Sequence, residues 1–214
     1  PGFVMYRMIA TFCGMQYRGV PLADDFELDL DAMLQAIEET QAALVFLAQP
    51  NNPTGNLFDL EAVKKVCAAT PGLVVLDEAY MAFTDRHHLA LMDEFDNVVV
   101  MRTLSKMGLA GLRLGMLFGA PEWLGEFEKV RLPYNINVLT EVSAKFALTH
   151  FDVMKAQTDE LRENRAELFA ALQTLPLARV WPSEANFILA RTQAGEARGV
   201  FEKLKEAGVL IKCL

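Results

Sequence analysis

The chain has 214 residues, of which 52% are hydrophobic and 22% are charged. This composition excludes disordered, collagen-like and coiled-coil proteins, and a chain of this length can bury a core without disulfide or metal support. The net charge of -8 makes a nucleic acid a poor partner, because an acidic protein repels a phosphate backbone.

Four short apolar runs in the first part of the chain predict the strands of a sheet. They lie at residues 43–48, 73–76, 98–101 and 114–118. Continuous runs of Val, Ile and Leu are typical of parallel strands that are buried on both faces.

Helical patterns separate some of these strands. One apolar stripe with helical spacing runs through Leu30, Met33, Leu34 and Ile37. Asp59 can cap a second helix, which ends before Pro71. The alternation predicts an α/β fold, with a mostly parallel sheet sandwiched by helices and right-handed crossovers.

The last third of the chain predicts a different unit. Helices are expected at 122–130, 138–149, 153–175 and 199–206, and strands at 178–181, 187–190 and 209–212. Gly208 stands where it can end the last helix. We place the boundary in the long helix, so that residues 1–155 form a large domain and residues 156–214 a smaller, partial α+β domain.

The cysteines and the absence of a long apolar run indicate a cytoplasmic protein. Cys13, Cys67 and Cys213 are odd in number and form no Cys-x-x-Cys motif, which favours reduced thiols. No apolar run reaches the roughly 20 residues of a membrane span, and Arg7 and Gly14 interrupt the apolar N-terminus where a secretory signal would lie. We therefore expect no membrane partner.

Two polar segments follow the first two strands, at the edge where open α/β sheets bind ligands. Residues 49–56 (QPNNPTGN) form either a plain loop or a rigid turn that presents an Asn amide to a ligand. Asp77 either caps a helix or binds a metal or a cofactor nitrogen. A metal is disfavoured, because the only nearby carboxylate, Glu78, would face the other way. His87 and His88 lack a third ligand and are interpreted as solvated loop residues.

A third polar segment (RTLSK) follows the strand at 98–101. A lysine is usually a solvated surface residue, but Lys106 precedes a glycine-rich apolar stretch. We expect a partly desolvated, nucleophilic amine. The hydroxyls of Thr103 and Ser105, with the guanidinium of Arg113, would form a phosphate cradle. Together the three segments suit pyridoxal phosphate, which carries an aldehyde, a ring nitrogen, a phenolic oxygen and a phosphate.

The motifs at 52–55 (NPTG), 77–80 (DEAY) and 105–115 (SKMGLAGLRLG) resemble those of the fold type I pyridoxal-phosphate aminotransferases. The sequence is most similar to the histidinol-phosphate aminotransferase branch, to which 1–6 (PGFVMY) and 132–135 (LPYN) also point. The resemblance covers essentially the whole chain. Its motifs are specific to the superfamily and moderately specific to the branch.

The resemblance implies a role for each matching residue. Lys106 would hold pyridoxal phosphate as a Schiff base and shuttle a proton, and Asp77 would pair with the ring nitrogen. Asn52 and Tyr80 would contact the ring oxygen, with Tyr80 counted among the catalytic residues. Phe3 would stack on the ring face.

The phosphate contacts implied by the resemblance come from Thr103, Ser105 and Arg113. The span from Lys106 to Arg113 is one residue shorter than in many relatives. A glycine-containing loop could absorb that difference.

The resemblance implies transfer of the amino group of L-histidinol phosphate to 2-oxoglutarate. The partners would be a small-molecule amino donor and a 2-oxo acid, and the full-length form would be a homodimer. Three alternatives stay open: an aromatic aminotransferase, a pyridoxal-phosphate decarboxylase of phosphorylated amino acids, and an inactive truncated fragment.

The family pattern also implies segments outside this chain. A phosphate-binding segment and an arm would precede Pro1, and an arginine that grips the substrate would follow Leu214. We therefore expect the chain to be the middle of an aminotransferase and to be inactive alone.

Overall fold

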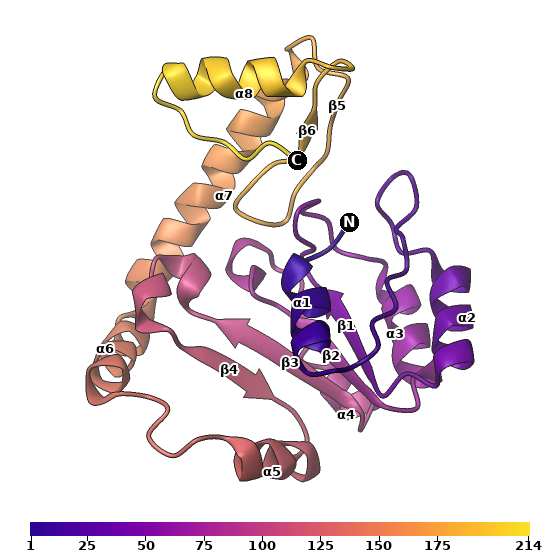
Figure 1. Cartoon of the computed structure of the whole chain (residues 1–214). Coiled ribbons are helices and arrows are strands. Elements are labelled where there is room, and N and C mark those ends of the chain that lie inside the picture. Colours follow the sequence, from indigo (N-terminus) through magenta and orange to yellow (C-terminus); the bar gives the residue numbers. More distant parts are fainter.

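A four-stranded sheet with the strand order β1-β2-β3-β4 forms the centre of the fold (Figure 1). The structure is a computed structural model, and it describes residues 1–214. The strands are β1 (Leu44–Ala48), β2 (Leu73–Asp77), β3 (Val98–Thr103) and β4 (Gly115–Phe118). The first three strands pair in parallel, and β4 runs antiparallel to β3.

The predicted mostly parallel sheet is confirmed, with one difference at β4. The apolar run at 114–118 predicts a parallel strand, but β4 is antiparallel and only partly buried. Its connection to β3 contains only the short 3-10 helices η2 (Ser105–Met107) and η3 (Ala110–Leu112). A parallel partner would need a crossover of about a dozen residues or more, usually through a full helix.

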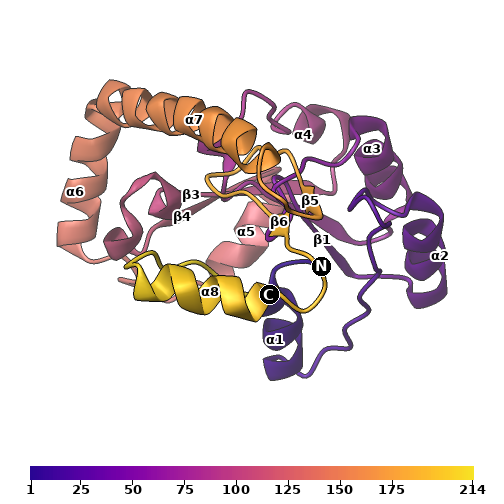
Figure 2. The same cartoon turned by 90° about the horizontal axis from the view of Figure 1, so that it is seen from above.

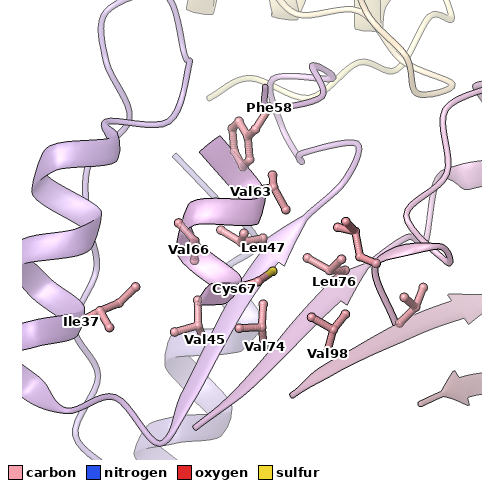
Figure 3. Close-up of a cluster of buried hydrophobic side chains, with 12 residues drawn as sticks. Ile37, Val45, Leu47, Phe58, Val63, Val66, Cys67, Val74, Leu76 and Val98 are labelled. Atoms are coloured by element: carbon pink, nitrogen blue, oxygen red, sulfur yellow. The ribbon is translucent and has the colours of Figure 1, made fainter. Parts of the chain in front are cut away.

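Three helices cover one face of the sheet and enclose the main core. They are α2 (Leu30–Thr40), α3 (Leu60–Ala69) and α4 (Leu91–Glu94). Figure 3 shows valines and leucines of β1, β2 and β3 packed against α3. Ile37 of the predicted stripe is buried, and Asp59 caps α3 by accepting a 2.9 Å hydrogen bond from the Ala62 backbone N–H.

The other face of the sheet carries α1 (Val4–Phe12), which the sequence patterns did not predict, and α5 (Pro121–Val130). Its core is smaller and is formed by Leu73, Val75 and Val99, with Trp123 of α5 packed against them. Tyr6 of α1 stacks on Phe46 of β1. The expected sandwich of helices around the sheet is therefore present.

The last third contains α6 (Val138–Thr149), α7 (Phe151–Gln173), β5 (Arg179–Val180), β6 (Ala190–Arg191) and α8 (Ala197–Glu206). Strands β5 and β6 form an antiparallel pair. Seen from above, α7 crosses one side of the molecule and α8 the other, with β5 and β6 between them (Figure 2). Gly208 ends α8 with a φ of 82°, as expected.

The strand predicted at 209–212 is wrong. Residues 209–214 form no regular element, and Val209 and Leu210 are exposed. The Val209 backbone N–H instead donates to the carbonyl of Leu204 in α8. An apolar run becomes a strand only where a neighbouring strand accepts its backbone hydrogen bonds, and the segment has no such neighbour in the structure.

Helix α7 runs without a break through the boundary placed at residue 155, so the division into 1–155 and 156–214 stays a prediction. Arg165 of this helix donates hydrogen bonds to the carbonyls of Phe83 and Ala185, which lie on the two sides of that boundary. None of the helices has the length and apolar content that crossing a membrane requires.

Candidate active site

Asp77 is the last residue of β2 and is half-buried. Its Oδ1 accepts a 3.1 Å hydrogen bond from the Ala79 backbone N–H, and its Oδ2 accepts a 2.6 Å hydrogen bond from the Tyr6 hydroxyl. No Lys, Arg or His pairs with this carboxylate. Asp77 therefore presents an acceptor without a counter-ion at the carboxyl end of the sheet.

Asn52 and Tyr80 come together although they follow different strands. The Asn52 Nδ2 donates a 3.1 Å hydrogen bond to the Tyr80 hydroxyl oxygen. The turn that holds Asn52 is closed by backbone hydrogen bonds from Gly55 to Asn51 and from Asn51 to Asn56. Parallel strands end at one edge of the sheet, which is why these two side chains can meet.

Lys106 lies in η2, the short 3-10 helix that follows β3 along the chain. Its Nζ is 5.1 Å from the centre of the Tyr80 ring, a distance typical of a cation–π contact. No acidic side chain pairs with it. The expected partly desolvated pocket is not formed, because the Lys106 side chain is exposed. Gly108 turns the chain here with a φ of 88°.

The predicted phosphate cradle is present only in part. The hydroxyl oxygens of Thr103 and Ser105 lie 2.9 Å apart, within hydrogen-bond distance, so these two groups lie side by side. Arg113 makes no hydrogen bond to either of them. It is exposed, takes a left-handed backbone conformation (φ 53°), and donates from Nη1 to the carbonyl of Ala110.

Phe3 and Tyr6 enter the site from the first turn of α1. Phe3 precedes the helix, and its ring meets the Tyr6 ring edge-on at 5.5 Å. The sequence patterns missed Tyr6. The signal that could have found it is its position three residues after Phe3, about one helical turn along the chain. Burial, and then the charge of Asp77, raise the pKa of the Tyr6 hydroxyl well above its ordinary value.

Phe187 is a second residue that the sequence patterns missed. Its ring meets the Tyr80 ring edge-on at 5.1 Å, so the chain after β5 reaches the site. No pattern of the sequence points to this contact. The neighbouring Asn186 is exposed.

Glu78 faces away from Asp77, as the alternation of a strand predicts. Its side chain is fully buried and accepts hydrogen bonds from the His88 backbone N–H (2.6 Å) and from Arg102 Nε (2.8 Å). His88 is therefore buried beside Glu78, which corrects the interpretation of both histidines as solvated; His87 is exposed. Burial by itself raises the pKa of Glu78, but the hydrogen bonds from His88 and Arg102 outweigh it and hold the pKa below its usual value.

Comparison with known families gives one match over nearly the whole chain. A family model described as aminotransferase class I and II matches residues 1–213. Among curated proteins, histidinol-phosphate aminotransferase 2 of Nitrosococcus oceani is 55% identical over all 214 residues, and histidinol-phosphate aminotransferase of Chromobacterium violaceum is 54% identical. The chain spans 59% and 60% of the lengths of these two relatives.

A solved structure supports the same relationship. The crystal structure of histidinol-phosphate aminotransferase from Sinorhizobium meliloti, in complex with pyridoxal-5'-phosphate, superposes with a TM-score of 0.88 at 31% sequence identity. The match covers 99% of this chain and 59% of that one.

Proposed function

The chain belongs to the class I and II aminotransferase family, and we propose that the whole protein is a pyridoxal-phosphate-dependent histidinol-phosphate transaminase. The reaction transfers the amino group of L-histidinol phosphate to 2-oxoglutarate and gives imidazole acetol phosphate and glutamate. The names of relatives at 55% and 54% identity over the whole chain support this assignment.

The observation that carries the proposal is the meeting of three strand ends around Tyr80. Asn52 donates to its hydroxyl, Lys106 lies over its ring, and Asp77 precedes it by three residues. Neither Asp77 nor Lys106 has a counter-ion. An unpaired amine, a carboxylate without a counter-ion and two adjacent hydroxyls suit the aldehyde, ring nitrogen and phosphate of pyridoxal phosphate, so the donor set fits the cofactor.

The chemistry that pyridoxal phosphate supplies when bound is a reactive aldehyde and an electron-withdrawing ring. Lys106 Nζ is the amine that would hold the aldehyde, and it would take and return the proton of the substrate carbon. Asp77 Oδ2 would accept from the ring nitrogen and balance its positive charge. Asn52 and the Tyr80 hydroxyl would hold the ring oxygen, and Phe3 would cover one face of the ring.

Thr103 and Ser105 are proposed to bind the cofactor's phosphate, since their hydroxyls already lie 2.9 Å apart at the end of β3. Arg113 is proposed as the third contact. Its exposed guanidinium now donates to the Ala110 carbonyl and would turn toward the phosphate on binding. Arginine suits this role because its fork matches phosphate oxygens.

We propose a homodimer in the cytoplasm, with residues 1–155 as the cofactor-binding domain and residues 156–214 as part of the smaller one. Exposed apolar side chains on α1, such as Ile9 and Phe12, support a subunit contact. The three free cysteines support a reducing compartment.

A panel of amino donors tests the function. The whole protein is given pyridoxal phosphate, 2-oxoglutarate and one donor at a time: L-histidinol phosphate, phenylalanine, tyrosine or phosphothreonine. Glutamate formation should show the highest kcat/KM with L-histidinol phosphate. Lys106→Ala should abolish turnover, and Lys65→Ala on the exposed face of α3 should not.

Two outcomes of this panel would contradict the proposal. A higher kcat/KM with phenylalanine or tyrosine would assign an aromatic aminotransferase. Release of carbon dioxide from the phosphorylated amino acid without glutamate formation would assign a decarboxylase.

A further inference from the structure

The hydroxyl of Tyr6 and the carboxylate of Asp77 form a short polar contact in the candidate site. The two residues are 71 positions apart, and the hydroxyl lies 2.6 Å from Oδ2. A hydrogen bond from a hydroxyl to a charged carboxylate is short and strong compared with one between neutral groups. The contact joins α1 to the end of β2, the strand end that carries Asp77.

The packing of the Tyr6 ring fixes the direction of its hydroxyl. One face of the ring stacks on Phe46 of β1, with the ring centres 4.7 Å apart and the planes 18° from parallel. Phe3 meets the same ring nearly at a right angle, 85° between the planes. These two contacts restrict the Tyr6 ring from two sides. They keep the ring in the orientation in which its hydroxyl reaches Asp77.

We propose that Tyr6 is the positioning residue for Asp77, holding its carboxylate in the orientation that would accept from the ring nitrogen of the cofactor. The proposal rests on the proposed function. Ala79 N–H binds Oδ1 and Tyr6 binds Oδ2, so each oxygen of Asp77 has one fixed donor and keeps one free lone pair. Without Tyr6 the carboxylate could rotate and take up water in place of the hydroxyl.

The protonation state of Tyr6 agrees with this role. Burial and the nearby charge of Asp77 raise the pKa of the hydroxyl, so it stays protonated and remains a donor at neutral pH. A neutral donor holds the carboxylate without neutralising its charge. The charge therefore remains available for the protonated ring nitrogen.

The test compares two ligands in the whole protein. One is pyridoxal phosphate, and the other is its analogue with a carbon in place of the ring nitrogen. Tyr6→Phe keeps the ring and its stacking on Phe46 but removes the hydroxyl. We expect it to weaken binding of pyridoxal phosphate roughly tenfold or more, and to leave binding of the analogue nearly unchanged.

Controls separate a positioning role from a structural one. Tyr17→Phe removes a half-exposed hydroxyl and should change neither affinity. In an Asp77→Ala background, Tyr6→Phe should have no further effect on either ligand. Tyr6→His, which keeps a ring with an N–H donor, should retain part of the affinity and serves as the second variant if Tyr6→Phe is too unstable to purify.

Three results would overturn the inference. Equal weakening of both ligands by Tyr6→Phe would assign Tyr6 a structural role, and unchanged affinity for pyridoxal phosphate would remove any role. Failure of the wild-type protein to bind pyridoxal phosphate would overturn the proposed function and this inference with it.

Discussion

Arg102 at the end of β3 forms an ion pair with the fully buried Glu78, the residue that follows β2. Arg102 Nε donates a 2.8 Å hydrogen bond to Glu78 Oε2, and Nη2 lies 2.7 Å from the same oxygen in a contact that is not an aligned hydrogen bond. The pair joins the two strand ends that carry Asp77 and Lys106. The ion pair lies on the side away from Asp77 and therefore stabilises the two strand ends that position the candidate site.

Replacing Glu78 should destabilise the fold strongly. Glu78→Ala leaves the partly buried Arg102 without its partner and should lower the free energy of unfolding by about 3–5 kcal/mol. Glu78→Gln should cost less, because its amide oxygen still accepts a hydrogen bond. Glu94→Gln is the control, since its 2.8 Å ion pair with Lys64 is partly exposed to solvent and should contribute much less. Urea unfolding measures all three, and equal losses at positions 78 and 94 would contradict the account.

Because of the same ion pair, the free energy of unfolding should depend on pH in the acid range. The pKa of Glu78 is lower in the folded chain than the ordinary value of about 4.3. Its contribution is therefore present above the ordinary pKa and is lost as the pH falls through the folded pKa. The stability difference between wild type and Glu78→Gln should shrink as the pH falls through the acid range. A difference that grows on acidification would show the opposite sign.

Arg165 should matter more for stability than Arg162, although both lie on α7. Arg165 Nη1 donates to the Phe83 carbonyl at 3.1 Å and to the Ala185 carbonyl at 2.8 Å, and both acceptor residues are buried. Arg165→Met leaves two carbonyls without a donor and should cost about 2 kcal/mol or more. Arg162→Met breaks an ion pair with the exposed Asp85 and should cost less than about 1 kcal/mol. Thermal unfolding measures the loss of stability in the two variants. A larger loss for Arg162→Met than for Arg165→Met would refute the role of Arg165.

Gly55 should not tolerate a side chain. Its φ of 80° is strained for other residues, and a Cβ there would overlap the Ser183 hydroxyl. Gly55→Ala should lower the free energy of unfolding by about 2 kcal/mol or more. Gly111→Ala, where a Cβ meets nothing within 4 Å, should change it by less than about 0.5 kcal/mol. Adding Ser183→Gly to Gly55→Ala should recover only the part of the lost free energy of unfolding that the overlap causes. Full recovery would show that the positive φ of residue 55 causes no strain.

The elements that the sequence predicted correctly have strong local signals. The caps at Asp59 and Gly208 and the stripe through Ile37 depend on neighbouring residues alone, and the structure contains them. The antiparallel direction of β4 and the missing strand at 209–212 depend on which neighbours are available for pairing. A single apolar run does not contain that information.

The candidate site shows the same difference between features that local sequence predicts and features that depend on distant parts of the chain. The sequence predicts that the segments of Asn52 and Tyr80 lie at one edge of the sheet, because both follow parallel strands. Only the family resemblance implies that the two side chains share a contact. Tyr6 and Phe187 reach the site through helix packing and through the loop after β5, which no motif predicts. His88 was misread because the sequence does not show that Glu78, ten residues earlier, lies buried beside it.

Asp77→Asn should separate binding of the cofactor from turnover in the whole protein. Asparagine keeps the size of the side chain but not the charge that would balance the ring nitrogen. Pyridoxal phosphate should still bind, while kcat should fall about 100-fold or more. Asp93→Asn on the exposed surface of α4 is the control and should leave kcat unchanged. Near-normal turnover of Asp77→Asn would show that Asp77 is not the partner of the ring nitrogen.

Lys106 is proposed as the amine that holds the cofactor. The most direct measurement is borohydride reduction of the whole protein in the presence of pyridoxal phosphate, followed by proteolysis and mass spectrometry. The reduced cofactor should be attached to the peptide that contains Lys106. Attachment to another lysine such as Lys65, or no attachment at all, would contradict it.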